Sequence, residues 1–173
     1  MFKLVNGDII IREGVPEDAE ALIAYLNTIG GESDNLSFGA GEFTIPIERE
    51  REFLKTTLEK DKSCLLVVLR GDRLIADGSV SQKPRRMGHR AELGISVLRS
   101  EWGRGVGTLL MEALIAYARD HGLEYLDLEV RSDNEKAIRL YKKLGFTVCG
   151  TIPGYMKVNG ENHDVLTMCL DLR

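Results

Sequence analysis

The pattern of apolar and polar positions predicts a strand and two helices at the start of the chain, several strands in the middle, and both helices and strands in the last third. Residues 8–12 (DIIIR) predict a first strand, and Pro16 followed by two acidic residues predicts the start of a helix that ends near 30–31. The segment 32–46 contains glycines without a helical period, so we expect a loop of the length that often carries function. A charged helix is predicted over 47–60.

Strands dominate the middle of the chain, over 63–69, 73–81 and 90–98, and they should form an antiparallel meander. After that, we predict helices over 105–121 and 135–144, a strand over 125–130 between them, and two final strands over 146–152 and 165–170. This order predicts an α/β chain with a mixed sheet. Because no repeat, low-complexity tract or linker interrupts the pattern, we treat residues 1–173 as one domain.

Composition narrows the class of protein. The chain has 173 residues, 43% of them apolar and 29% charged, and a net charge of -4. This balance argues against a nucleic-acid partner bound through a generally basic surface. No run of eighteen uncharged apolar residues exists, and the start MFKLVNGD lacks the pattern of a secretory signal. We therefore expect a cytoplasmic protein without a membrane partner.

The three cysteines, Cys64, Cys149 and Cys169, are odd in number, distant in sequence and set among apolar residues. They are interpreted as small core residues in a reducing compartment, and not as bridges or metal ligands. The three histidines are equally dispersed, with no spacing typical of zinc sites. We expect no catalytic metal.

The most informative stretch is AELGISVLRSEWGRGVG, residues 91–107, which runs from a strand through a glycine-rich turn into a helix. Gly103, Gly105 and Gly107 allow a ligand to approach the backbone closely, and the free amides of a first helical turn favour phosphate. The alternative is that these glycines only make a tight connection. A Walker A loop is excluded because no Lys-Ser or Lys-Thr follows.

A dinucleotide fingerprint also fits poorly. Leu109 or Leu110 lies where the third glycine is expected, and the turn follows several elements instead of the first strand. Two of the structural conditions for that fingerprint therefore fail.

Two motifs resemble those of the GNAT superfamily of acyl-CoA-dependent N-acyltransferases. The pyrophosphate motif R/Q-x-x-G-x-G/A falls on residues 102–107, with Trp102 in place of the first residue. The signature N-x-x-A-x-x-L-Y-x-K-x-G-F is met at Asn134, Ala137, Leu140, Tyr141, Lys143, Gly145 and Phe146. The resemblance covers most of the chain and is tightest over 91–146.

The resemblance implies the GNAT fold, with an antiparallel N-terminal meander and splayed central strands flanked by helices. It also implies binding of acetyl-CoA, with the pantetheine arm along one central strand and the diphosphate at the turn. By this likeness the cofactor-binding residues are Ile95, Ser96, Val97, Trp102, Gly103, Arg104, Gly105, Val106, Gly107, Thr108, Asn134 and Tyr141. The loop over 38–43 would line the acceptor side.

The implied reaction is direct transfer of acetyl from acetyl-CoA to a primary amine in a ternary complex. A protonated amine has no lone pair, so a base must help, and Glu92 matches a position where family members often carry a carboxylate. Tyr141 matches the tyrosine that serves as general acid. Simpler alternatives are a strand glutamate that faces solvent or pairs with Arg90, an ordinary amphipathic tyrosine, and an Asn134 that only caps its helix.

The resemblance leaves the acceptor open among a small polyamine or amino-acid derivative, an aminoglycoside-like compound and a peptide or protein amine. The alternative function is a non-catalytic module that binds acyl-CoA. Dimers are frequent in the superfamily, so a homodimer is one expected assembly. A basic patch at Lys83, Arg85, Arg86 and Arg90 is interpreted as solvated charge, or as a contact for an acidic substrate or the nucleotide end of the cofactor.

Overall fold

The computed structural model describes residues 2–173, which form one mixed sheet of eight strands with four α-helices. The helices are α1 (Ala19–Glu32), α2 (Ile47–Leu58), α3 (Val106–Asp120) and α4 (Glu135–Lys143). The strands are β1 (Lys3–Asn6), β2 (Ile9–Glu13), β3 (Cys64–Arg70), β4 (Arg73–Gln82), β5 (Arg90–Val97), β6 (Tyr125–Arg131), β7 (Thr147–Val158) and β8 (Glu161–Asp171). Short 3-10 turns occur at Pro16–Asp18, Arg85–Met87 and Arg99–Glu101.

The strand order is β1-β2-β3-β4-β5-β6-β8-β7. The predicted meander is confirmed, because β3, β4 and β5 pair antiparallel in sequence order. The β5–β6 pair is parallel, and α3 provides the crossover between its two strands. The mixed α/β sheet expected from the order of elements is therefore present.

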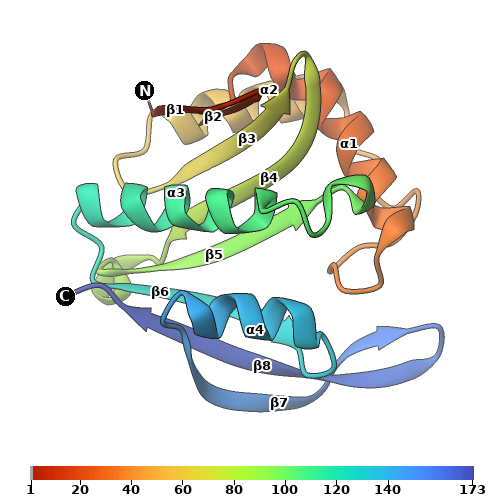
Figure 1. Ribbon diagram of the computed structural model, residues 1–173, viewed down its shortest axis with the longest axis vertical. Coiled ribbons are helices and arrows are strands. Elements are labelled where there is room, and N and C mark those ends of the chain that lie inside the picture. The colour runs from red at the N-terminus through yellow and green to blue at the C-terminus, as the bar shows by residue number, and fades with distance from the viewer. Residues whose placement is uncertain (1) are drawn as a thin grey trace.

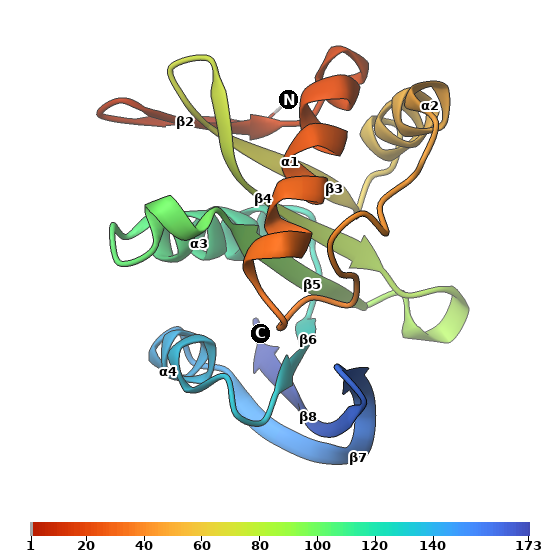
Figure 2. The same ribbon diagram turned by 90° about the vertical axis from the view of Figure 1, so that its right-hand side faces the viewer.

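Helices cover both faces of the sheet (Figures 1 and 2), with α3 and α4 on one side and α1 and α2 on the other. Leu22 of α1, Leu54 of α2 and Leu114 of α3 are fully buried. The packing is close where α3 crosses β4: a Cβ added at Gly78 would lie 2.8 Å from Leu114 Cδ1. Truncation of such a leucine to alanine typically costs about 3 kcal/mol of stability.

The ends of the chain depart from the prediction. β1 was not expected, because its four residues are all exposed and carry no apolar alternation; it pairs with β2 across Gly7, whose φ is +61°. β7 and β8 extend well beyond the predicted 146–152 and 165–170. Their additional residues, in the hairpin closed by Asn159 and Gly160, are mainly exposed; those of β7 include a proline and a glycine and those of β8 begin with four polar residues, so no apolar alternation marked them.

The two central strands separate after a short contact. Only Arg90, Ala91 and Glu92 of β5 pair with β6 in the described chain. Beyond Glu92 the β5 edge that faces β6 has no strand partner within residues 2–173, so the splayed strands implied by the resemblance are confirmed. No helix within residues 2–173 is sufficiently long and apolar to span a bilayer.

Candidate active site

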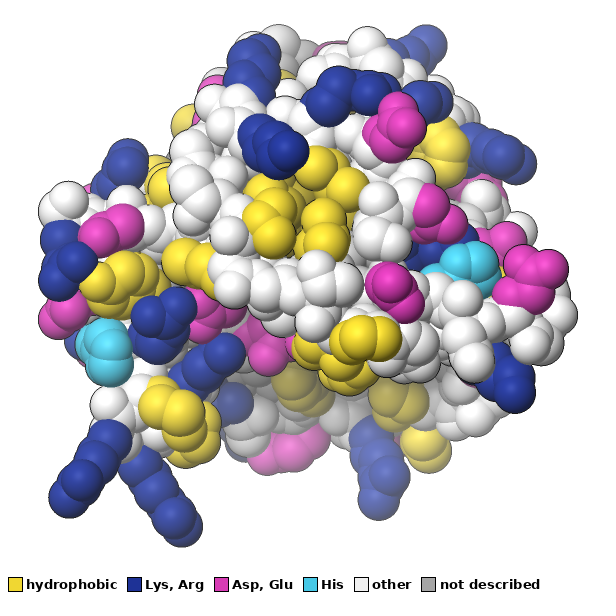
Figure 3. All heavy atoms as spheres, turned by 90° about the horizontal axis from the view of Figure 1, so that it is seen from below, with side chains coloured by type: hydrophobic (Ala, Val, Ile, Leu, Met, Phe, Trp, Pro, Cys, Tyr) yellow, Lys and Arg dark blue, Asp and Glu magenta, His cyan; other side chains and the backbone are white. Residues whose placement is uncertain are grey.

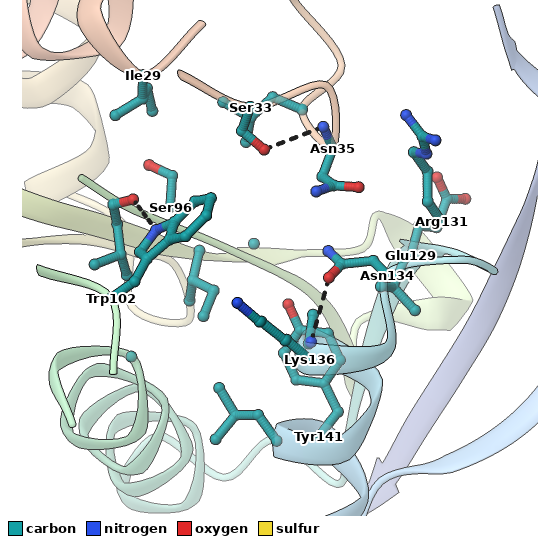
Figure 4. Close-up of a pocket in the computed structure, with 18 of the residues that line it drawn as sticks. Ile29, Ser33, Asn35, Ser96, Trp102, Glu129, Arg131, Asn134, Lys136 and Tyr141 are labelled. Carbon is teal, nitrogen blue, oxygen red and sulfur yellow. Dashed lines mark hydrogen bonds between the residues drawn. The ribbon is translucent and has the colours of Figure 1, made fainter. Parts of the chain in front are cut away.

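A cavity of about 830 Å³ opens where β5 and β6 diverge. Its walls come from β5 and β6 themselves and from four further regions: the turn before α3, the first turns of α4, the end of α1 with the loop after it, and the β7–β8 segment. Figure 4 shows side chains from α1 and the loop after it, from β5 and β6, from the turn before α3 and from the α4 segment around one space. The cavity therefore joins segments from both halves of the chain.

The turn before α3 has the geometry of an anion site. Gly103 and Gly105 have φ of +76° and +81°, which a residue with a Cβ rarely adopts. Gly105 caps α3, and Leu109 N donates to Gly105 O at 3.0 Å. The amides of Val106, Gly107 and Thr108 precede that bond and stay available at the positive end of the helix. They line the cavity, and they fit a diphosphate.

Trp102, which departs from the family motif, has a defined role in the cavity wall. Its indole Nε1 donates to Val97 O at 2.8 Å, and the residue is 43% exposed. The Val97 carbonyl that accepts this bond belongs to the strand segment expected to face the pantetheine arm. The Arg99 guanidinium and Lys136 ammonium lie 5.6 and 5.8 Å from the ring centroid. Lys136 was not predicted, because on the sequence it is one lysine among several on a charged helix.

Ser96 lies in the wall and connects the cavity to a partly buried polar network. Its Oγ donates to Asp77 Oδ1 on β4, and the Tyr25 hydroxyl lies 2.8 Å from the same Oγ. Burial, assisted by the nearby Glu50 carboxylate, raises the pKa of Asp77 to about 6. Sequence reasoning missed this network; the available signal was an aspartate in the middle of an apolar strand.

Tyr141 and Asn134, both on the α4 side, point into the cavity (Figure 4). Burial raises the pKa of Tyr141 to about 12, so its phenol is protonated at neutral pH. Asn134 Oδ1 accepts a hydrogen bond from Ala137 N at 3.3 Å and caps α4, as one of the two interpretations predicted.

Glu92 lies at the fork itself, in the last pair between β5 and β6, opposite Asp127. The suggested partner Arg90 pairs with Asp127 instead, with Nε donating to Oδ2 at 3.0 Å. Glu92 is exposed and borders the large cavity. Glu129, two residues along β6, raises the pKa of Tyr155 through its negative charge and a hydrogen bond. Neither Glu129 nor Tyr155 was predicted, since polar residues on strand edges carry no motif.

The loop between α1 and α2 meets the cavity at Ser33, Asn35, Leu36 and Ser37, whereas residues 38–43, expected on the acceptor side, do not line this cavity. The rings of Phe38 and Phe43 are 5.5 Å apart and pack against the core. A close approach fixes the loop as well, because a Cβ on Gly30 would lie 2.6 Å from Gly39 O. The apolar side chains anchor the loop, and its polar beginning lines the site.

The interpretation of the cysteines needs correction. Cys64 is buried, as predicted, but Cys149 is exposed and its Sγ lies 2.8 Å from Sγ of Cys169. The two are distant in sequence, but the pairing of β7 with β8 places them side by side. Within residues 2–173, no group of three or more His, Cys, Asp or Glu side chains could hold a metal ion.

The basic patch divides into two parts. Lys83 and Arg90 both form ion pairs with Asp127, whereas Arg85 and Arg86 are exposed. Figure 3, viewed from the β7 end of the molecule, shows Lys and Arg side chains mixed with acidic ones on that face. Asp127 therefore offsets the charge of Lys83 and Arg90, and Arg85 and Arg86 stay at the exposed tip.

Known proteins share this architecture. The model of the acetyltransferase (GNAT) family matches residues 33–146, more than half of the chain. The chain belongs to the GNAT family. The crystal structure of a GNAT acetyltransferase from Streptococcus pneumoniae superposes with a TM-score of 0.91 at 28% identity, over 94% of this chain and 99% of that one. A Salmonella typhimurium structure, yncA with acetyl-CoA, shares the fold with a TM-score of 0.84 at 21% identity, covering 96% and 95%.

Curated relatives match this GNAT chain over different lengths. The L-amino acid N-acetyltransferase AaaT of Escherichia coli K12 is 42% identical over 92 residues, which is 51% of this chain and 55% of AaaT. The uncharacterized N-acetyltransferase YoaA of Bacillus subtilis is 26% identical over 95% of this chain and 94% of its own. The mycothiol acetyltransferase of Propionibacterium freudenreichii is matched over only 20% of its length. This chain thus spans about half of AaaT and a fifth of the mycothiol enzyme.

Proposed function

We propose that the protein transfers the acetyl group of acetyl-CoA to a primary amine, by direct attack in a ternary complex. The observation that carries this proposal is one continuous cavity. It borders the free amides of Val106, Gly107 and Thr108 at one end and the carboxylate of Glu92 at the other. When bound, acetyl-CoA supplies an activated thioester; the chain's own residues position it and move protons.

The acceptor side requires a base. An alkyl ammonium with a pKa near 10 is almost fully protonated at neutral pH and cannot attack. In this proposal Glu92, exposed at the strand fork, receives that proton directly or through a water molecule. Glu129 lies on the same wall and adds a second negative charge. The two carboxylates attract an ammonium ion to the fork, so association should weaken as salt increases.

The leaving side requires an acid. A thiolate leaves more easily when a donor supplies a proton, and the buried, protonated phenol of Tyr141 lines the cavity near the α3 turn. Since its pKa is raised to about 12, the phenol keeps its proton across the physiological range. We assign Tyr141 as the general acid and Asn134 as a hydrogen-bonding group for the pantetheine arm.

The acceptor that we propose is a small-molecule amine. Relatives are named for L-amino acids and for spermidine, both of which carry ammonium groups at neutral pH. The polar cavity edge at Ser33, Asn35 and Ser37 supplies hydrogen-bonding groups for such a molecule. A cytoplasmic location and a homodimer remain predictions from the sequence.

The test is release of free thiol from acetyl-CoA with a panel of amino acids, polyamines and short peptides. The proposal expects thiol release that depends on one class of small amine and matches the amount of acetylated product. Binding of acetyl-CoA without thiol release for any amine would favour the non-catalytic module. Activity with peptides alone would overturn the choice of acceptor.

A further inference from the structure

Cys149 and Cys169 form a pair of thiols that the acetyl-transfer reaction does not use. They lie on adjacent antiparallel strands, β7 and β8, with their Sγ atoms 2.8 Å apart. The pairing register shifts between Val148 and Gly150, which makes Cys149 the additional residue of a β-bulge. Because a bulge redirects a side chain, this irregularity explains how Cys149 reaches a residue that pairs with Thr147.

The surroundings of the pair differ from those of the remaining cysteine. Cys149 is exposed and Cys169 is partly exposed, so dissolved oxidants can reach them. Cys149 Sγ donates to Cys169 Sγ, and this hydrogen bond, together with desolvation, raises the pKa of Cys149. The Arg90 guanidinium lies within interaction distance of the Cys169 sulfur. Cys64 is inaccessible, and burial raises its pKa to about 12.

We propose that Cys149 and Cys169 are a redox-active dithiol, a modification site that closes to an intramolecular disulfide when it meets a peroxide or a small disulfide. The sulfur atoms need to approach by only about 1 Å to reach bonding distance. In reducing compartments such pairs are typically transient and responsive to oxidants. The inference concerns thiol chemistry and does not depend on the proposed acetyltransferase activity.

With hydrogen peroxide the reaction balances in two steps. The Cys169 thiolate attacks one peroxide oxygen, so an S–O bond forms, the O–O bond breaks and hydroxide leaves. The Cys149 sulfur then attacks the Cys169 sulfenic sulfur, so the S–S bond forms, the S–O bond breaks and the second oxygen leaves as water with the Cys149 proton. The hydroxide takes up the proton that the Cys169 thiol released on ionising, so overall the two thiols lose two electrons and two protons and the peroxide is reduced to two waters.

The site borders the proposed acceptor side. Both cysteines line a cavity of about 310 Å³ that also includes Glu92 and Glu129. Those two carboxylates border the large cavity as well, so they form the wall between the two spaces. A disulfide at this place would link β7 to β8 directly behind the carboxylates.

The experiment counts thiols in the full chain. Reduced wild-type protein is treated with stoichiometric hydrogen peroxide or with glutathione disulfide. It is then denatured in the presence of N-ethylmaleimide, which alkylates the remaining free thiols, and its mass is measured by intact-protein mass spectrometry. The matched variants are Cys149→Ser, Cys169→Ser and Cys64→Ala. Far-UV circular dichroism of each variant checks that it is folded.

We expect wild-type protein to lose about 2 Da, the mass of two hydrogens, and to keep one alkylated cysteine. Cys64→Ala should lose the same mass and keep none. Each serine variant should stop at a sulfenic acid or a glutathione adduct, with no internal bridge. Peptide mapping should identify a 149–169 link. Three alkylated cysteines in oxidised wild-type protein, or a bridge that involves Cys64, would overturn the proposal.

Discussion

Arg131 Nη1 donates a hydrogen bond to the main-chain oxygen of Asp34 at 2.8 Å, and so ties β6 to the loop that follows α1. The same guanidinium forms an ion pair with Asp133 at 2.6 Å and lies 3.0 Å from Nδ1 of His163. Its side chain is only 9% exposed. One buried cation therefore joins three segments around the acceptor edge of the cavity.

Arg131→Met should release that loop. The substitution keeps the apolar stem but leaves the Asp34 carbonyl without its charged donor, so we expect the free energy of unfolding to fall by about 2 kcal/mol. The KM for the amine should rise, because the loop provides part of the acceptor wall, while acetyl-CoA affinity changes little. Urea unfolding and steady-state kinetics measure both effects. Arg139→Met, on the exposed face of α4, is the control and should change neither quantity.

Gly105→Ala should weaken acetyl-CoA binding. At φ of +81° an alanine is strained by about 1 kcal/mol, and relief of that strain would rotate the amides of the α3 turn. We expect about tenfold weaker binding by calorimetry. Gly71→Ala carries similar strain, at φ of +59° in the β3–β4 turn outside the cavity, and should lose stability without losing affinity. Equal affinities for the two variants would contradict an anion site at the turn.

The sequence predicted those parts of the fold in which a single local feature, such as apolar periodicity or a glycine at a helix end, has one structural explanation. Apolar periodicity located α3 and α4, and Gly122 and Gly145 adopt positive φ beyond their ends. Glu92 was singled out from the resemblance, while its unpredicted neighbour Glu129 reaches the wall through strand pairing. Such contacts arise between residues far apart in sequence, so no local pattern announces them.

The exposure of Cys149 and its contact with Cys169 could not be predicted from local sequence either. Periodicity places Cys149 within an apolar run, and it was therefore expected to be buried. Cys149 lies on β7 at the edge of the sheet, where Thr147 and Val148 are exposed as well, and the pairing of β7 with β8 places it beside Cys169. The register of a long hairpin determines such a contact, and register is a property of the pair of strands.

Tyr141→Phe should lower turnover by about a hundredfold or more, since general acid assistance is typically of that size. The ring remains in place, so acetyl-CoA affinity should stay within about twofold. Tyr125→Phe, with its ring against Arg90 outside the cavity, is the control. Thiol release at saturating substrates gives kcat, and calorimetry gives affinity. Unchanged turnover in Tyr141→Phe would remove this residue from the mechanism.

Glu92→Gln should lower turnover at neutral pH, and the difference in turnover from wild-type protein should be smaller at high pH. At pH 10 a large fraction of an alkyl amine is already neutral, so less assistance from a base is needed. The pH–rate profile of the variant should rise with the ionisation of the free amine. Glu112→Gln, exposed on α3, serves as the matched control. Profiles of equal shape for Glu92→Gln and wild-type protein would assign the base elsewhere.

Asp77→Asn should change how stability depends on pH. Burial raises the folded pKa of Asp77 from 3.8 to about 6, so between these values the unfolded chain releases a proton that the folded protein retains. Stability is therefore lost as pH rises from about 4 to 6. Above pH 6 the penalty is constant, about 2 kcal/mol after allowance for partial exposure.

The asparagine variant keeps an acceptor for Ser96 but has no proton to lose. Its free energy of unfolding, measured in urea from pH 4 to 8, should fall less than that of wild-type protein over this window. Asp72→Asn, in the exposed β3–β4 turn, should follow wild-type protein. Parallel profiles for Asp77→Asn and wild-type protein would contradict a buried, proton-retaining carboxyl at this position.

The central claim is that the amides at the start of α3 bind the diphosphate of acetyl-CoA in the cavity between β5 and β6. The most direct measurement is calorimetric titration of the folded protein with acetyl-CoA, coenzyme A and pantetheine. The account predicts one site per chain for acetyl-CoA and coenzyme A, and affinity at least about a hundredfold weaker for pantetheine, which lacks the diphosphate. Equal affinity for all three ligands, or no binding of acetyl-CoA, would contradict it.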